Sequence, residues 1–411
     1  LFLLYVLRSA MQYFVTYFGH MLGVRIEATM RRDLFVHMQK LSFGFYDKSR
    51  TGQLMSRVTT DLFEISELAH HGPEDLFISI LTIVGAFLLM LSLNWKLALV
   101  IIVLLPLILW FVISNRRRML STSKEVKSRT ALINADIESS ISGIRVAQAF
   151  ANEKREIEKF DAGNTRFQMG KRLYYRAMAW FFSGMEFMTN ILYVVVLGVG
   201  GYLMLLGEMD AATLVAFMLF VNSFLTPIRK LTQFMEQFTA GYAGFERMCD
   251  LMDTRPDIED SPNAQKLGSV KGEICFEGVS FAYDRTKVLK DLDLTVRPGE
   301  KLALVGPSGG GKSTLCALIP RFYEPQAGRI LVDGQDIRSV TIASLRSQIG
   351  IVQQEVFLFA DTIRENIRYG RLGATDEEVV EAAKKAEIHE DIMALPNGYD
   401  TFVGERGVML S

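Results

Sequence analysis

A chain of 411 residues is long enough for two or more domains. Its formal net charge of −1 at pH 7 gives no support to a nucleic-acid partner, and we expect none. Hydrophobic residues make up 49% of the chain and are concentrated before about residue 230, which indicates a membrane domain followed by a more polar domain.

Five hydrophobic stretches in the first half predict membrane-spanning helices. Any one of them, taken alone, could be a buried core helix, but five in succession favour a polytopic membrane domain. Residues 97–114 carry no charge, whereas the first stretch is less apolar because it contains Arg8, Gln12 and His20. Short loops join the second to the third stretch and the fourth to the fifth, so each pair forms a hairpin. The stretches are 1–24, 77–93, 97–114, 187–206 and 211–228.

Basic residues orient these helices. They gather at one end of the spans, whereas the hairpin loops at 94–96 and 207–210 contain few of them. Since basic ends face the cytoplasm, the part of the chain after the last span is cytoplasmic too. This parity places residue 1 outside, within a helix already under way and without an initiator Met, so we expect a fragment that has lost its first transmembrane helix. The residues are Arg31, Arg32, Lys40, Arg116, Arg117, Arg118, Lys171, Arg172, Arg176, Arg229 and Lys230.

Residues 25–73 and 115–175 are too polar for lipid but keep a helical period. Each is long enough for a helix to continue past the membrane, turn and come back, because a helix rises about 1.5 Å per residue. The turns fall near 45–57 and 142–154.

Cysteines and histidines show no metal-ligand spacing in the sequence. Cys249, Cys275 and Cys316 are far apart, which fits buried thiols in a reducing compartment. The adjacent His70 and His71 are interpreted as a solvated loop pair.

An acidic stretch with two prolines, 253–263, marks the boundary of the second domain. After it, residues 273–281 and 288–296 alternate as strands do and are predicted to pair antiparallel. Residues 301–305 are predicted to form a buried strand and 314–319 a helix, so the pattern favours an α/β domain.

Residues 306–313, Gly-Pro-Ser-Gly-Gly-Gly-Lys-Ser, fit the phosphate-binding pattern G-x-x-x-x-G-K-[ST]. Glycines allow successive backbone N–H groups to turn toward the β- and γ-phosphates of a nucleotide at the start of a helix. Lys312 adds a positive charge, and the Ser313 hydroxyl can ligate Mg²⁺. The alternative is a glycine-rich turn that binds nothing, but the predicted strand and helix on either side favour a nucleotide site. Its predicted contacts are Gly306, Ser308, Gly309, Gly310, Gly311, Lys312, Ser313 and Thr314.

The chain resembles the half-transporters of the ATP-binding cassette (ABC) exporter family, close to bacterial lipid and multidrug exporters, over residues 1–411. The first polar turn carries the family pattern at Phe45, Asp47, Thr51, Gly52, Ser56, Arg57 and Asp61. The resemblance implies a membrane α-helical bundle over 1–250, with about five of six helices, a linker over 251–269, and an α/β P-loop nucleotide-binding domain over 270–411. Both polar turns would be coupling helices that dock on the nucleotide domains, the first mainly on that of the partner subunit. The partner is then a second half-transporter, in a homodimer or a heterodimer.

Further cassette motifs follow in the family order. Tyr283 matches the aromatic residue that stacks on adenine, although without the loop downstream it would be an ordinary strand-end tyrosine. Gln354 matches the glutamine that links Mg²⁺ and water to the membrane domain; we prefer it to Gln353 because it falls four residues before the Leu-Phe pair at 358–359. The resemblance thus gives Lys312 and Gln354 catalytic roles, and Ser313 and Gln354 roles at the metal.

The last motifs lie at the end of the chain. Residues 401–407 match an exporter-specific loop in which Glu405 and Arg406 are kept and Phe402 departs from the pattern. Ser411 is the second residue of the signature motif, which contacts the γ-phosphate of the ATP held by the opposite subunit. The later acidic strand with the catalytic Glu is not in this sequence, so we expect the intact protein to be an ATPase and this chain not to hydrolyse ATP efficiently.

The expected function is ATP-driven export of lipids or hydrophobic or amphipathic compounds across the cell membrane by alternating access. Two alternatives remain: a peptide- or haem-type exporter, and a membrane nucleotide sensor, channel or degenerate heterodimer partner that does not hydrolyse ATP. ATP and Mg²⁺ are the expected cofactors, and membrane lipids surround the helices. Candidate residues for the substrate cavity are Glu186, Asn190, Asn222, Trp180, Phe181, Phe182 and Phe187.

Overall fold

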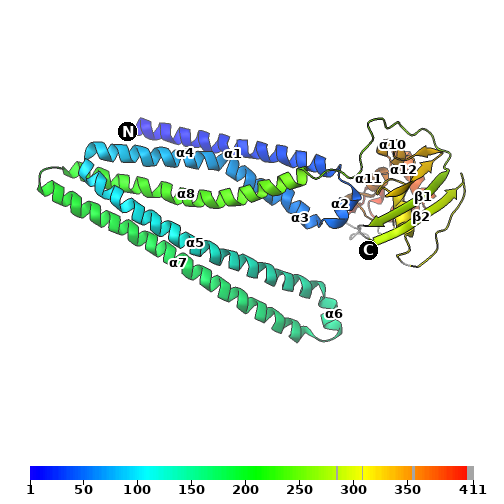
Figure 1. The fold of residues 1–411 in the computed structure, drawn as a ribbon, viewed down its shortest axis with the longest axis horizontal. Helices are drawn as coiled ribbons and strands as arrows, with labels where there is room; N and C mark the ends of the chain where they lie inside the picture. Colours follow the sequence, from blue (N-terminus) through cyan, green and yellow to red (C-terminus); the bar gives the residue numbers. More distant parts are fainter. Residues whose placement is uncertain (284–285, 308, 354–356, 405–411) are drawn as a thin grey trace. The chain divides into compact units, whose positions relative to one another are not determined.

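A computed structural model describes residues 1–283, 286–307, 309–353 and 357–404 (Figure 1). Its contacts divide the chain into two compact units, Leu1–Leu41 with Phe45–Pro256 and Ser42–Gly44 with Asp257–Ser411. The first unit is helical, and the second combines helices with two small sheets.

Long helices build the first unit. Figure 1 shows α1, α4 and α8 running side by side, and α5 beside α7. α5 has 48 residues and is therefore about 72 Å long, more than twice the ~30 Å of a bilayer hydrocarbon core. The polar stretches predicted to continue past the membrane are thus extensions of the same helices. The long helices are α1 (Phe2–Met38), α4 (Leu62–Leu93), α5 (Trp95–Ser142), α7 (Glu153–Leu205) and α8 (Ala211–Met252).

Short helices occupy the two predicted polar turns. Between α1 and α4 lie α2 (Phe43–Lys48), α3 (Thr51–Ser56) and a π-helical turn (Arg57–Asp61). Between α5 and α7 lies α6 (Ile144–Ala149). Their docking on nucleotide domains stays a prediction.

Three of the five predicted spans lie in helices that are long and apolar enough to cross a membrane, Thr51–Leu93, Trp95–Ser142 and Glu153–Leu205. The fourth lies in a shorter apolar segment of α8, Ala211–Ser223. α1 does not reach the same apolarity, because the polar residues noted above interrupt it. It is nevertheless one continuous helix.

Polar caps form both predicted hairpin turns. The Asn94 side chain accepts a hydrogen bond from Leu97 N (3.1 Å) and starts α5, so Asn94 alone separates α4 from α5. The Asp210 side chain accepts one from Thr213 N (2.8 Å) and starts α8. The two turns are linked to each other, since Lys96 Nζ lies 2.6 Å from a Glu208 carboxylate oxygen.

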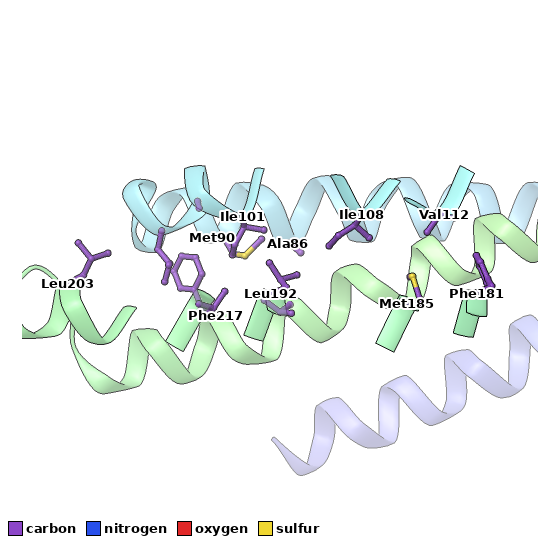
Figure 2. Packing of buried hydrophobic residues seen from close by; sticks show 14 residues of the cluster. Ala86, Met90, Ile101, Ile108, Val112, Phe181, Met185, Leu192, Leu203 and Phe217 are labelled. Atoms are coloured by element: carbon purple, nitrogen blue, oxygen red, sulfur yellow. The ribbon is translucent and has the colours of Figure 1, made fainter. Parts of the chain in front are cut away.

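The membrane core lies between α5 and α7 and closes against the ends of α4 and α8 (Figure 2). Figure 2 shows Ile108 and Val112 on α5 facing Met185 and Phe181 on α7. Phe181 was predicted to line a substrate cavity, and this prediction is wrong: its side chain is buried in this core. A helix turns about 100° per residue, so adjacent aromatics cannot share one face, and the neighbouring Trp180 and Phe182, with Phe187 further along, are exposed.

The prediction of a solvated loop pair at His70 and His71 is also wrong. Both residues lie inside α4, and the His70 side chain is buried. The loop interpretation failed because α4 begins at Leu62, well before its apolar stretch. Gly23 of α1 gives the His70 ring room, since a Cβ at that position would stand 3.0 Å from His70 Nδ1.

The second unit contains a four-stranded antiparallel sheet in the order β2-β1-β3-β4. The predicted pairing of 273–281 with 288–296 is confirmed, with Ile274 opposite Val296. The buried side chains of Phe276, Val279 and Ile330 pack against Leu318 of the helix after the loop. The elements are β1 (Ile274–Tyr283), β2 (Thr286–Val296), α9 (Lys312–Leu318), β3 (Ala327–Val332), β4 (Gln335–Asp336), α10 (Ile342–Arg346), β5 (Asp361–Thr362), α11 (Ile363–Arg368), α12 (Asp376–Lys385), α13 (His389–Met393) and β6 (Phe402–Val403).

The predicted buried strand at 301–305 does not form. These residues have no regular structure, and the Leu302 and Val305 side chains are 47% and 90% exposed. A strand is stabilised by hydrogen bonds to its neighbours, and within the described ranges no strand of either sheet pairs with this stretch. Its apolar residues predict burial, but burial requires a partner strand.

Candidate functional site

The phosphate-binding loop of 306–313 has the backbone that its glycines predict. Gly306, Gly309 and Gly311 have φ values of 151°, 78° and 84°, a region that other residues rarely adopt. Gly310 N donates a hydrogen bond to Pro307 O (3.1 Å), which closes the turn. Ser308 lies outside the described residues.

Gly311 joins the loop to both α9 and the sheet. It is the N-cap of α9, and Leu315 N donates to its carbonyl oxygen (2.9 Å). A Cβ at this position would lie 2.9 Å from Leu289 Cδ2 and 3.0 Å from Val288 Cγ1, both on β2. The close approach and the left-handed backbone each require glycine here. Burial of Thr314, Leu315 and Leu318 fixes α9 on the sheet.

Lys312 stands at the start of α9 with its side chain turned back over the loop. Its Nζ donates hydrogen bonds to Gly306 O (2.9 Å) and Pro307 O (2.7 Å). The ammonium group therefore lies over the loop carbonyls, beside the N–H groups that would face an anion. Ser313 follows it and is exposed. A cationic head, glycine amides and a free hydroxyl side by side suit a nucleotide phosphate and its divalent metal.

Tyr283 reaches this loop from the end of β1. Thr314 Oγ1 donates toward the Tyr283 hydroxyl oxygen at 3.4 Å, so the two predicted binding residues are brought together. The Tyr283 ring meets Phe281 and Tyr323 nearly edge-on, with ring centres 4.8 and 5.2 Å away. Tyr283 remains 39% exposed.

Gln326 supports Tyr283 and was not predicted. Its side chain accepts a hydrogen bond from Ala282 N (2.7 Å) and donates one to Ala282 O (2.9 Å). This pair fixes the backbone next to Tyr283 on the side of β3, where the ladder between β1 and β3 ends at Ser280 and Ala327. No motif marks Gln326, because an amide that binds backbone can come from anywhere in a sequence.

Several predicted residues lie outside the described part of the chain, namely Ser308, Gln354, Glu405, Arg406 and Ser411. Gln353, the alternative to Gln354, is described and exposed. Phe402 lies in β6, which pairs with β5 through Thr362. The described residues thus bring together Tyr283, Thr314, Lys312 and the loop glycines.

Two family models match the chain. The ABC transporter transmembrane region matches residues 1–228, and the ABC transporter model matches residues 289–411. The first match ends within α8, and the second begins within β2, before the predicted phosphate-binding loop.

Similarity to other proteins, in sequence and in structure, extends over almost the whole chain. An uncharacterized ABC transporter ATP-binding protein of Bacillus subtilis, YwjA, is 47% identical over 100% of this chain and 72% of its own length. An ATP-dependent lipid A-core flippase of Syntrophus aciditrophicus is 36% identical over 100% of this chain and 68% of its own. The solved structure of a bacterial Atm1-family ABC exporter with ATP bound has a TM-score of 0.75 at 30% identity and covers 95% of this chain and 69% of its own.

These matches coincide with the observed architecture. Apolar helices make up the segment matched by the transmembrane model, and the glycine loop with Lys312 lies in the segment matched by the second model. The chain therefore belongs to the ABC transporter family, as a multi-pass membrane protein with a cytoplasmic ATP-binding domain.

Proposed function

We propose that this protein exports lipids or other hydrophobic or amphipathic compounds, and that ATP bound at the loop of 306–313 drives the export. The observation that carries the proposal is the loop itself, with its left-handed glycines and Lys312, on the same chain as the apolar helices. Relatives named a lipid A-core flippase and a putative multidrug export protein support this class of substrate. The chain is interpreted as a transmembrane domain over 1–250, a linker over 251–269 and a cassette domain over 270–411.

Different residues would contact different parts of the nucleotide. Backbone N–H groups of Gly309 and Gly311 would donate to the phosphates, and the Lys312 ammonium would move from the loop carbonyls to the phosphate oxygens. Replacing the two loop carbonyl oxygens by phosphate oxygens as acceptors for Lys312 Nζ costs little electrostatic energy, because both are oxygen acceptors. Tyr283 would stack on the adenine, held in place by Gln326.

Mg²⁺ fits the same site. Ser313 is exposed beside Lys312, and a hydroxyl oxygen next to the phosphates is a ligand that Mg²⁺ takes in nucleotide sites. We assign Gln354 as a second contact of the metal from the family pattern. Ser313 and Gln354 would hold the ion, which when bound would supply positive charge to offset the negative charge of phosphoryl transfer.

The site is completed by a second half-transporter, which is either another copy of this chain or a relative. The signature motif that begins at Leu410 and Ser411 would contact the ATP held by the partner. ATP binds the closed pair more tightly than the open one, and this difference in affinity shifts the membrane helices between inward- and outward-open states. The short helices α2 and α6 would transmit the movement.

Lys312→Ala in the full-length protein tests the loop. We expect this variant to show no measurable MgATP binding when a fluorescent ATP analogue is titrated into it. We also expect it to show no ATP-dependent transport into inside-out vesicles. Lys384→Ala is the matched control, because Lys384 is an exposed lysine on α12, which supplies no residue to the loop. An unchanged ATP affinity in Lys312→Ala would contradict the role of the loop.

Transport by the wild-type protein tests the substrate class separately. We expect ATP to drive uptake of a labelled phospholipid or a hydrophobic dye, and not of haem or a hydrophilic peptide. Uptake of haem or peptide alone would contradict the proposed substrate class and leave the ATP site intact.

A further inference from the structure

We propose that His20, His70 and His71 form a binding site for a divalent transition-metal ion such as Zn²⁺, within the membrane unit. His20 lies on α1, and the other two lie on α4. The ring centre of His70 is 4.8 Å from that of His20 and 4.0 Å from that of His71. One ring nitrogen from each histidine lies within 4.8 Å of the other two.

The hydrogen bonds of two of these rings leave nitrogen lone pairs directed away from the helix backbone. His70 Nδ1 lies 2.9 Å from Ser66 O, and His20 Nδ1 lies 2.7 Å from Thr16 O. A carbonyl oxygen only accepts, so Nδ1 carries the proton in both rings and Nε2 carries the lone pair. Metal-bound histidines in proteins show this arrangement, in which the second ring nitrogen donates to a carbonyl or carboxylate.

His70 Nε2 is the atom of the cluster that most strongly indicates a ligand. The His70 side chain is only 7% exposed, and its Nε2 is buried without a hydrogen-bond partner among the described residues. A buried polar atom without a partner destabilises the folded protein. A metal ion shared with His20 and His71 would remove that destabilisation.

Carboxylates and an open space complete the chemistry around His71. Glu67 Oε2 lies 3.7 Å from His71 Nε2, and Glu74 Oε2 lies 4.0 Å from His71 Nδ1. Either nitrogen can therefore bind a metal while the other is oriented by a carboxylate. Asp75 does not compete, since it is paired with Lys230 (2.7 Å).

A cavity of about 350 Å³ opens at this place, and its lining includes His20, His71 and Glu74. It offers an entry path for an ion and room for a water ligand. Three imidazoles with a water or carboxylate in the fourth position make a tetrahedral Zn²⁺ site.

The backbone of α1 is adapted to this cluster. A Cβ at Gly23 would stand 3.0 Å from His70 Nδ1, and one at Gly19 would stand 3.9 Å from both His70 Cδ2 and Glu74 Oε2. Glycines on either side of His20 thus let α4 bring its imidazole and carboxylate close to α1. Zn–N bonds of about 2.0–2.1 Å place tetrahedral ligands about 3.4 Å apart. The exposed His20 ring can close the remaining distance by a small side-chain rotation that keeps its hydrogen bond to Thr16 O.

An ion at this site would join α1 to α4. The experiment is a Zn²⁺ titration of the untagged, chelator-treated full-length protein in lipid nanodiscs, in competition with a chromogenic chelator. We expect one tight site per chain and a higher Tm in the presence of Zn²⁺. His20→Gln, His70→Gln and His71→Gln should each weaken Zn²⁺ affinity by more than about tenfold and remove the rise in Tm.

His37→Gln is the matched control, because His37 lies on the same helix α1 but bonds to Thr254 O (3.0 Å) instead of joining the cluster. It should leave Zn²⁺ affinity unchanged. If His70→Gln does not fold, the Zn²⁺ affinity of His20→Gln tests the proposal, because His20 is exposed. Absence of a one-to-one site in the wild type, or equal Zn²⁺ affinity in His20→Gln and His37→Gln, would overturn the proposal.

Discussion

Replacing Gly311 with alanine tests the nucleotide loop most directly. Gly311 has a φ of 84°, and a Cβ there would contact Leu289 and Val288 at 2.9 and 3.0 Å. The left-handed conformation costs a residue with a Cβ about 1–2 kcal/mol, before any contact is counted. Leu289 Cδ2 ends a flexible side chain and can move by a few tenths of an ångström. Val288 is β-branched and stiff, so its contact adds to the backbone cost.

The cost appears as a loss of ATP affinity. In Gly311→Ala the loop reduces its strain by leaving the conformation that presents its N–H groups, and ATP has to restore that conformation. Apparent affinity falls by the fraction of molecules in the competent state. A cost of about 1–2 kcal/mol therefore raises the Kd for ATP about 5- to 30-fold.

A fluorescent ATP analogue titrated into the full-length protein measures this change. Gly268→Ala is the matched control, because Gly268 has no atom within 4 Å of an added Cβ and no left-handed φ. It should bind ATP as the wild type does. A Kd for Gly311→Ala within twofold of the control would show that the loop conformation described here is not the one that binds ATP.

Two further predictions concern the ring near the loop and an ion pair in the membrane unit. Tyr283→Ala should weaken ATP binding by about 1–3 kcal/mol if the ring stacks on adenine, whereas Tyr283→Phe should bind nearly as well; equal affinities for all three proteins would return Tyr283 to an ordinary strand-end residue. Arg247 Nε and Nη2 donate to the buried Asp61 carboxylate at 2.8 and 2.6 Å, and the hydrogen bond raises the pKa of Arg247. Arg247→Met should lower the Tm more than Asp61→Asn does, because it leaves the Asp61 carboxylate, which is 8% exposed, without its cationic partner. In Asp61→Asn the Arg247 side chain, which is 46% exposed, can still be solvated. The reverse order of Tm values in thermal unfolding would contradict this account.

Local signals in the sequence predicted much of the fold. The hairpin turns at Asn94 and Asp210 follow from two apolar runs separated by a few polar residues, and the structure adds only their side-chain caps. The pairing of β1 with β2 follows from alternation in adjacent segments. Each of these features depends on residues close in sequence, so a pattern along the chain is sufficient to find it.

Features that depend on distant partners were predicted less well. Residues 301–305 have the composition of a buried strand, but composition does not supply the neighbouring strands that would pair with them. Phe181 was grouped with its aromatic neighbours, and only the helix packing separates it from Trp180 and Phe182. Gln326 supports Tyr283 from 43 positions further along the chain, and no local signal connects the two.

A weak signal for the histidine cluster is present in the sequence. His20 and His70 lie far apart in sequence, and neither is part of a metal-binding spacing. Gly19 and Gly23, however, are one helical turn apart, and such pairs of small residues let another helix approach closely in a membrane domain. A histidine between them then lies beside whatever the second helix brings there. In α4 this is a pair of adjacent histidines, of which one is buried with a lone pair that no described residue satisfies. Glycine spacing on one helix and polar residues on another therefore predict a buried polar contact when they are considered together, although each pattern alone indicates only packing or a solvated turn.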